Sequence, residues 1–286
     1  MYRLPQHLLS WATAALFLGF AWKGLFFDFP LREFFWNEAL LSDLLASFGI
    51  DWSWWVSAEG VNAYLPNIQL FISIAFVLGF IAVWWQNMPI RSIFVWLAIV
   101  FNTIVLLLGL PGHNYSFGYV LEIALRFGTP LLWLAGSRQT ISVNTYFLAR
   151  IFIAATFIGH GLYAMNYYPR PYSFVNWTTA GLGISEPSAI NLLFAVGILD
   201  LIAAALLLIP KPSWSIPVAM TWLLPWAFLT TLARYWANSA YEDFSYLILR
   251  WSPEVLIRVP HVLVVLAVFV AWRSAHRKLN LSRLIE

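Results

Sequence analysis

The chain has 286 residues, of which 61% are hydrophobic, 18% are aromatic and only 10% are charged. Soluble domains carry about 25% charged residues, so this composition excludes a large water-soluble domain and indicates a membrane protein with several spans. The sequence contains no cysteine, which excludes disulfides, thiolate metal sites and iron–sulfur clusters within the chain. Its formal net charge of +3 is small and dispersed, so nucleic-acid binding is not predicted.

A transmembrane helix needs about 20 consecutive apolar residues to cross the hydrocarbon core of a bilayer. The first such segment is not followed by a small-residue cleavage site, so we expect a retained helix and not a signal peptide. The predicted fold is all-α, a polytopic membrane protein. Its eight transmembrane helices are predicted at residues 7–27, 67–85, 91–110, 117–136, 145–165, 188–209, 214–233 and 252–273.

The longest connection between spans, residues 28–66, is rich in tryptophan and in acidic residues. Tryptophan favours the headgroup zone of a bilayer, so we expect this segment to form short amphipathic helices at the outer interface. It is also the surface on which a partner protein at the outer face would dock. Its tryptophans are Trp36, Trp52, Trp54 and Trp55.

The charges of the loops and tails divide between the two sides of the predicted membrane. Acidic residues dominate one side, whereas the other side carries nine basic residues and a single acid, Glu286. By the positive-inside rule the basic side is cytoplasmic, so both termini are predicted to lie in the cytoplasm. The basic residues are Arg3, Arg91, Arg138, Arg150, Lys211, Arg273, Arg277, Lys278 and Arg283.

Short matches between the two halves indicate an internal repeat. Residues 14–19 match residues 154–159, and further matches follow in the same order in both halves. We therefore predict two four-helix repeats of the same orientation, residues 1–140 and residues 141–286, the second ending in a basic tail. Chance similarity between apolar segments is the alternative.

Two Glu-x-x-x-Arg sequences stand out from these apolar segments: Glu122 with Arg126, and Glu254 with Arg258. A charged side chain at the centre of a membrane-spanning helix costs roughly 2.5–3.5 kcal/mol even on the lenient insertion scale, so it needs a partner, a cavity or a function. The spacing of four residues places each pair on one face of its helix, in the favourable order for an ion pair. We predict that these four residues contribute to substrate binding.

Other polar residues lie at a similar depth. His261 continues the face of Glu254 and Arg258, whereas the matching position of the first half is Thr129. Counting about 1.5 Å per residue places both pairs, His160 and Lys23 in the outer half of the membrane. We predict one polar cluster there, with His261 and His160 as catalytic groups and Lys23 as a binding residue. Asp200, the lone acid of its helix, is also predicted to bind substrate.

Alternatives to a functional site stay open at the level of sequence. The two pairs could form a network that only joins the repeats. His160 could be a hydrogen-bonded packing residue, and Asp200 could be protonated or paired. No motif for a metal, a nucleotide or a serine hydrolase occurs, so no metal site is predicted.

The four-helix unit resembles the DoxX-like family of membrane proteins. The resemblance rests on a glycine-containing first helix, Phe17-Leu-Gly19 and Phe157-Ile-Gly159-His160-Gly161, and on a fourth helix with Glu-x-x-x-Arg. It covers both halves, as a tandem duplication. Family members include membrane subunits of thiosulfate:quinone oxidoreductase, so the resemblance implies quinone-linked redox chemistry in a prokaryotic cytoplasmic (inner) membrane. The duplication, the tryptophan-rich segment and the Thr129/His261 difference depart from the family pattern.

We therefore expect an integral membrane component of a quinone-linked redox system that binds a quinone-like molecule in the outer half of the bilayer. The arginines would stabilise negative charge on the quinone oxygens, the glutamates would hold the arginines, and a histidine would exchange protons. Two other classes remain: a binder or transporter of a small molecule or lipid, and a non-catalytic subunit that docks a partner.

Overall fold

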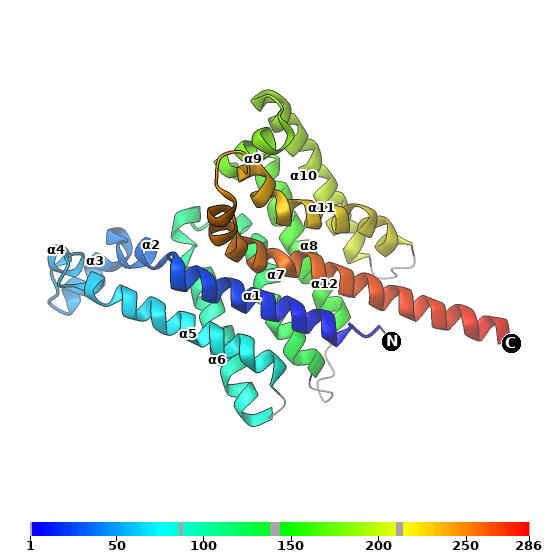
Figure 1. Ribbon diagram of the computed structural model, residues 1–286, viewed down its shortest axis with the longest axis horizontal. Coiled ribbons are helices and arrows are strands. Elements are labelled where there is room, and N and C mark those ends of the chain that lie inside the picture. Colours follow the sequence, from blue (N-terminus) through cyan, green and yellow to red (C-terminus); the bar gives the residue numbers. More distant parts are fainter. Residues whose placement is uncertain (1, 86–87, 138–143, 210–213, 286) are drawn as a thin grey trace. The chain divides into compact units, whose positions relative to one another are not determined.

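The computed structural model describes residues 2–285 apart from 86–87, 138–143 and 210–213 (Figure 1). Within these ranges the secondary structure is entirely helical, with twelve α-helices and two short 3-10 helices. Eight helices are long and apolar enough to cross a membrane, which confirms the predicted class of multi-pass helical membrane protein. They are α1 (Gln6–Phe26), α5 (Leu65–Trp84), α6 (Met88–Leu108), α7 (Phe117–Ser137), α8 (Thr145–Ala164), α10 (Glu186–Leu208), α11 (Ser215–Asn238) and α12 (Phe244–Ile285).

The last two membrane helices extend beyond their predicted spans, α11 at its end and α12 at both ends. α11 continues to Asn238, five residues beyond position 233, and α12 begins at Phe244, eight residues before position 252. In α11 the polar side chains at this end bond the helix itself: Arg234 donates to the carbonyl of Thr230 at 3.0 Å, and Asn238 donates to the carbonyl of Arg234 at 2.7 Å. Hydropathy identifies only the apolar part of a helix, whereas the backbone hydrogen bonds continue into the polar residues that follow it.

The tryptophan-rich segment forms the short helices that were predicted: α2 (Leu31–Phe35), α3 (Glu38–Ser47), α4 (Trp52–Trp55) and η1 (Val61–Ala63). The side chains of Asn37 and Asp51 accept hydrogen bonds from the backbone N–H groups of Leu40 and Trp54, which caps α3 and α4. The Trp55 indole donates to the carbonyl of Phe35 at 2.9 Å, which ties α4 to α2.

The contacts divide the chain into two compact units. One comprises Met1–Leu16 with Phe117–Glu286, and the other comprises Phe17–Ser116. Helix α1 begins in the first unit and continues into the second. These units do not follow the two sequence halves, because α7 groups with the helices of the second half. The division into repeats 1–140 and 141–286 stays a prediction.

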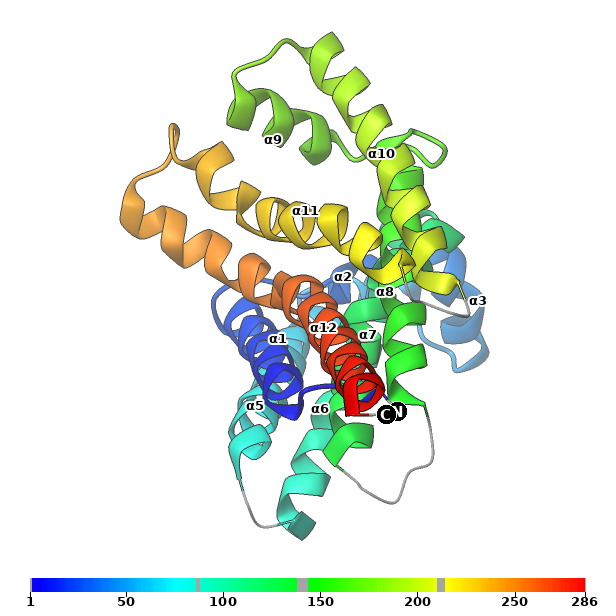
Figure 2. The same ribbon diagram turned by 90° about the vertical axis from the view of Figure 1, so that its right-hand side faces the viewer.

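The first unit is built around α8, which contacts α7, α10 and α12 (Figure 2). Two glycines of α8 permit close approach: a Cβ at Gly159 would lie 2.6 Å from the backbone N of Glu122 on α7, and a Cβ at Gly161 would lie 2.8 Å from the carbonyl oxygen of Gly197 on α10. His160 lies between these glycines. It therefore projects from a helix that is held closely on two sides.

The N-terminal end of the chain packs on the start of α8 and approaches the late part of α12. The Tyr2 ring stacks on Tyr146 near the start of α8 at a centroid distance of 4.4 Å, and it lies 6.2 Å from the His276 ring in the late part of α12. Which side of a membrane this end faces stays a prediction.

Candidate functional site

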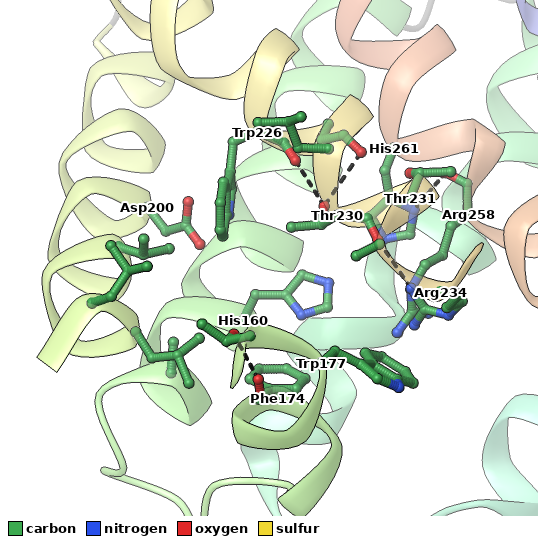
Figure 3. A pocket seen from close by; sticks show the side chains of 18 of the residues that line it. His160, Phe174, Trp177, Asp200, Trp226, Thr230, Thr231, Arg234, Arg258 and His261 are labelled. Atoms are coloured by element: carbon green, nitrogen blue, oxygen red, sulfur yellow. Dashed lines mark hydrogen bonds between the residues drawn. The ribbon is translucent and has the colours of Figure 1, made fainter. Parts of the chain in front are cut away.

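A cavity of about 270 Å³ lies among α8, α10, α11, α12 and the short helix α9 (Tyr172–Leu182) (Figure 3). It lies at the end of the unit where α8 finishes and α10 begins. Its walls are mainly aliphatic and aromatic, including Phe157, Phe174, Trp177 and Trp226. Its polar and charged lining residues are His160, Thr178, Asp200, Thr230, Thr231, Arg234, Arg258 and His261.

Two histidines meet at this cavity from different helices. The rings of His160 on α8 and His261 on α12 lie 5.7 Å apart between centroids, and the ring of Phe174 on α9 lies 6.4 Å from His160. The Nδ1 atom of His261 lies 3.1 Å from the carbonyl oxygen of Arg258. A carbonyl can only accept, so Nδ1 carries the proton and Nε2 of the neutral ring keeps its lone pair.

Arg234 of α11 is held against the aromatic wall of the cavity. Its guanidinium carbon lies 4.4 Å from the centroid of the Trp177 ring, which is the geometry of a cation–π contact (Figure 3). The Trp177 ring in turn packs edge-to-face on Trp251 of α12 at 5.9 Å. Arg234 is only 3% exposed, so this contact occurs out of water.

A cluster of charges continues behind the cavity wall. Glu122 and Arg126 form the predicted ion pair on α7, with 3.4 Å between the carboxylate and guanidinium atoms, and their side chains are 10% and 13% exposed. The charges of both, and of Glu254, are close enough to act on Arg234 and Arg258. Three guanidiniums face two carboxylates, so with neutral histidines the cluster carries one net positive charge.

Several buried polar atoms at this end have no hydrogen-bond partner among the described residues. They are Oγ1 of Thr231, Nε of Arg234 and Nε2 of His261, and all three residues line the cavity. Buried polar groups are ordinarily satisfied, because leaving one unpaired costs about 1–3 kcal/mol. Their arrangement offers donors and acceptors to a polar group inside the cavity.

The opposite wall carries Asp200 of α10, which is 1% exposed. The indole of Trp222 donates to Oδ1 of Asp200 at 2.7 Å, and the ring of Trp226 stacks on Trp222 at 5.3 Å. Figure 3 shows Asp200 and Trp226 side by side, away from Arg234 and Arg258. The cavity thus has a carboxyl on one wall and guanidiniums on the other.

The structure brings most of the predicted site residues together. His160, Asp200, Arg258 and His261 line the cavity, while Glu122, Arg126 and Glu254 belong to the adjoining charged cluster. Lys23 lies in the last turn of α1 and belongs to the other compact unit. Its inclusion in the polar cluster stays a prediction. Thr129 donates to the carbonyl of Leu125 within α7 at 2.6 Å.

Sequence reasoning missed Arg234, Thr231 and Trp177. The predicted seventh span ended at residue 233 and so excluded Arg234, and no helix was predicted over residues 172–182. An available signal was the run Thr230-Thr231-Leu-Ala-Arg234, which places polar side chains at helical spacing at the end of an apolar segment. Within the described residues no group of three or more His, Cys, Asp and Glu side chains could hold a metal ion.

No family model matches the chain, and comparisons with curated proteins and with solved structures found no match.

Proposed function

We propose that this protein is the membrane component of a quinone-linked redox system and that its cavity binds the ring of a quinone-like molecule. The observation that carries the proposal is the combination of aromatic walls with three unpartnered polar atoms, on Thr231, Arg234 and His261. Ligand pockets are mostly apolar with a few placed polar groups, and measure about 300–1,000 Å³. A cavity of about 270 Å³ suits a single substituted ring.

The polar residues suggest a role for each group. Arg258 and Arg234 would donate to a quinone oxygen and stabilise the negative charge that develops there during reduction. Nε2 of the neutral His261 would take up protons one at a time and donate each to a quinone oxygen as the quinone is reduced. His160, whose ring lies 5.7 Å from that of His261, would supply these protons to His261. Glu122 and Glu254 would keep the guanidiniums charged and in place.

The reaction needs an electron carrier besides this chain. Reduction of a quinone to a quinol takes two electrons and two protons, and in this proposal the electrons come from a partner oxidoreductase that docks on the tryptophan-rich segment of residues 28–66. The predicted topology would place the cavity in the outer half of an inner membrane. Membership of the DoxX-like family is part of the same proposal.

Replacing Arg258 tests the proposal directly. With the protein in lipid nanodiscs, a benzoquinone carrying a decyl chain is titrated while tryptophan fluorescence is recorded. We expect Arg258→Gln to weaken binding about ten-fold or more, because a hydrogen bond from a charged donor contributes about 1.5–3 kcal/mol. Arg250→Gln on the same helix is the matched control, because the Arg250 side chain is 45% exposed and lies 4.0 Å from Glu242.

The outcome also separates the proposal from a structural role. If the charged cluster only joins the helices, Arg258→Gln lowers the thermal stability and leaves the quinone affinity of the folded variant unchanged. That result would rule out quinone binding through Arg258.

The net positive charge of the cluster favours a second candidate, a binder or transporter of a lipid or small molecule with a carboxylate or phosphate group. Laurate, a simple fatty acid, would then bind in place of the quinone, and the affinity would again fall in Arg258→Gln. Laurate binding without any quinone binding would favour this candidate over the redox component.

A further inference from the structure

The most exposed residues that line the cavity are all apolar. Of the residues that line it, four large apolar ones are strongly exposed: Leu182 at 56%, Leu192 at 39%, Leu229 at 42% and Trp236 at 41%. They come from three helices, α9, α10 and α11. We call these four residues the apolar rim.

The polar end of the cavity is closed by comparison. Arg234 is 3% exposed, Thr231 is 4% exposed and His261 is 5% exposed, although all three line the same cavity. The cavity is therefore a pocket with a buried polar end and an apolar mouth. A charged, water-soluble molecule that entered through the rim would lose its hydration there. It would find polar partners only at the far end of the cavity.

Two of the four rim residues lie more than one helical turn inside helices that are long and apolar enough to span a membrane. Leu192 lies six residues into α10, about 9 Å along the helix from its first residue. Leu229 lies nine residues before the end of α11, about 13 Å from its last residue. Both helices are candidate membrane spans. In a bilayer that these two helices span, Leu192 and Leu229 would face the lipid chains.

From this geometry we infer that the ligand is an amphiphile that enters sideways from the bilayer between α9, α10 and α11. Its ring lies at the polar end, and its hydrocarbon chain leaves through the apolar rim into the lipid. The inference rests on the proposed function, and it adds the route of entry and the requirement for a chain. The volume of about 270 Å³ is enough for such a ring.

The test compares two ligands with the same ring, 2,3-dimethoxy-5-methyl-benzoquinone and its decyl derivative, in nanodiscs of one lipid composition. The quantity of interest is the ratio of the two affinities, because partition of the decyl compound into the bilayer affects every variant equally. We expect Leu192→Trp to lower the decyl-to-ring affinity ratio at least ten-fold by filling the rim.

Leu199→Trp is the matched control, because Leu199 lies on the same helix, is 41% exposed and does not line the cavity. It should leave the ratio unchanged. Leu229→Trp fills the rim from the opposite wall and repeats the test if Leu192→Trp does not fold.

The possible results separate the two proposals. If the bare ring binds the wild type and neither rim variant changes the ratio, the lateral entry is wrong and the proposed function stands. If neither ligand binds the wild type above protein-free nanodiscs, the proposed function fails and the lateral entry fails with it.

Discussion

At the scale of single residues, the site depends on how a buried guanidinium is accommodated. Arg234 meets the Trp177 ring at 4.4 Å and bonds the carbonyl of Thr230, yet its Nε has no partner among the described residues. A charge removed from water is tolerated only where other groups replace its hydration. The aromatic ring supplies part of that replacement, and the proposed ligand would supply the rest.

A double-mutant cycle measures the contact between these two residues. Cation–π contacts contribute about 0.5–2 kcal/mol, the higher values where the groups are desolvated. We expect Trp177→Leu to lower the free energy of unfolding by about 1–2 kcal/mol more in the wild type than in an Arg234→Gln background, measured by chemical unfolding in detergent. Equal effects in the two backgrounds would show that the ring only fills space.

At the scale of elements, α8 positions His160 through its glycines. A methyl group at Gly159 would contact only backbone atoms of α7, and the nearest atom to a methyl group at Gly161 would be the backbone carbonyl oxygen of Gly197 on α10. Small residues that allow such approach are the usual means of helix association in membranes, because lipid is as apolar as the helix faces. The distance between His160 and the charged cluster of α7 therefore depends on Gly159.

Gly159→Ala tests this packing. We expect the substitution to destabilise the protein by about 1–3 kcal/mol, because backbone atoms of α7 must move to relieve the overlap. Thermal unfolding in one detergent provides the measurement. At Gly136 the nearest atom to an added Cβ is the side-chain oxygen of Gln6, which can rotate away, so Gly136→Ala is the control and should have a smaller effect. Equal melting temperatures for the two variants would contradict a special role for Gly159.

At the scale of the whole molecule, the topology can be tested because the sequence contains no cysteine. Single cysteines replace Ala58 near the tryptophan-rich helices, Ala240 between α11 and α12, and Ser274 late in α12. All three positions are exposed. By the positive-inside rule we expect a membrane-impermeant maleimide to label Ala58→Cys and Ala240→Cys in intact cells, and Ser274→Cys only after lysis. The reverse pattern would invert the predicted orientation.

The sequence by itself determined the eight membrane helices and one local pairing. Length and hydropathy are enough to predict a membrane-spanning helix. Backbone N–H and C=O groups cannot be left unpaired in hydrocarbon, and a helix pairs them with one another. The Glu122–Arg126 pair followed from helical spacing, because residues four apart share a face whatever the tertiary fold. The short helices of residues 28–66 were also predicted, from their tryptophans and acids.

Only the tertiary structure decided which residues form the cavity. Leu192 and Leu199 are both exposed apolar residues of α10, yet only Leu192 lines the cavity, and nothing in composition distinguishes them. In a helix that is apolar all round, hydropathy does not reveal which face meets a neighbour. Arg234 joined the site because α11 continues beyond its apolar segment and because α9 presents Trp177 to it. Such contacts depend on how each helix is rotated about its axis and on how closely neighbouring helices approach. Both are determined by residues that are distant in the sequence.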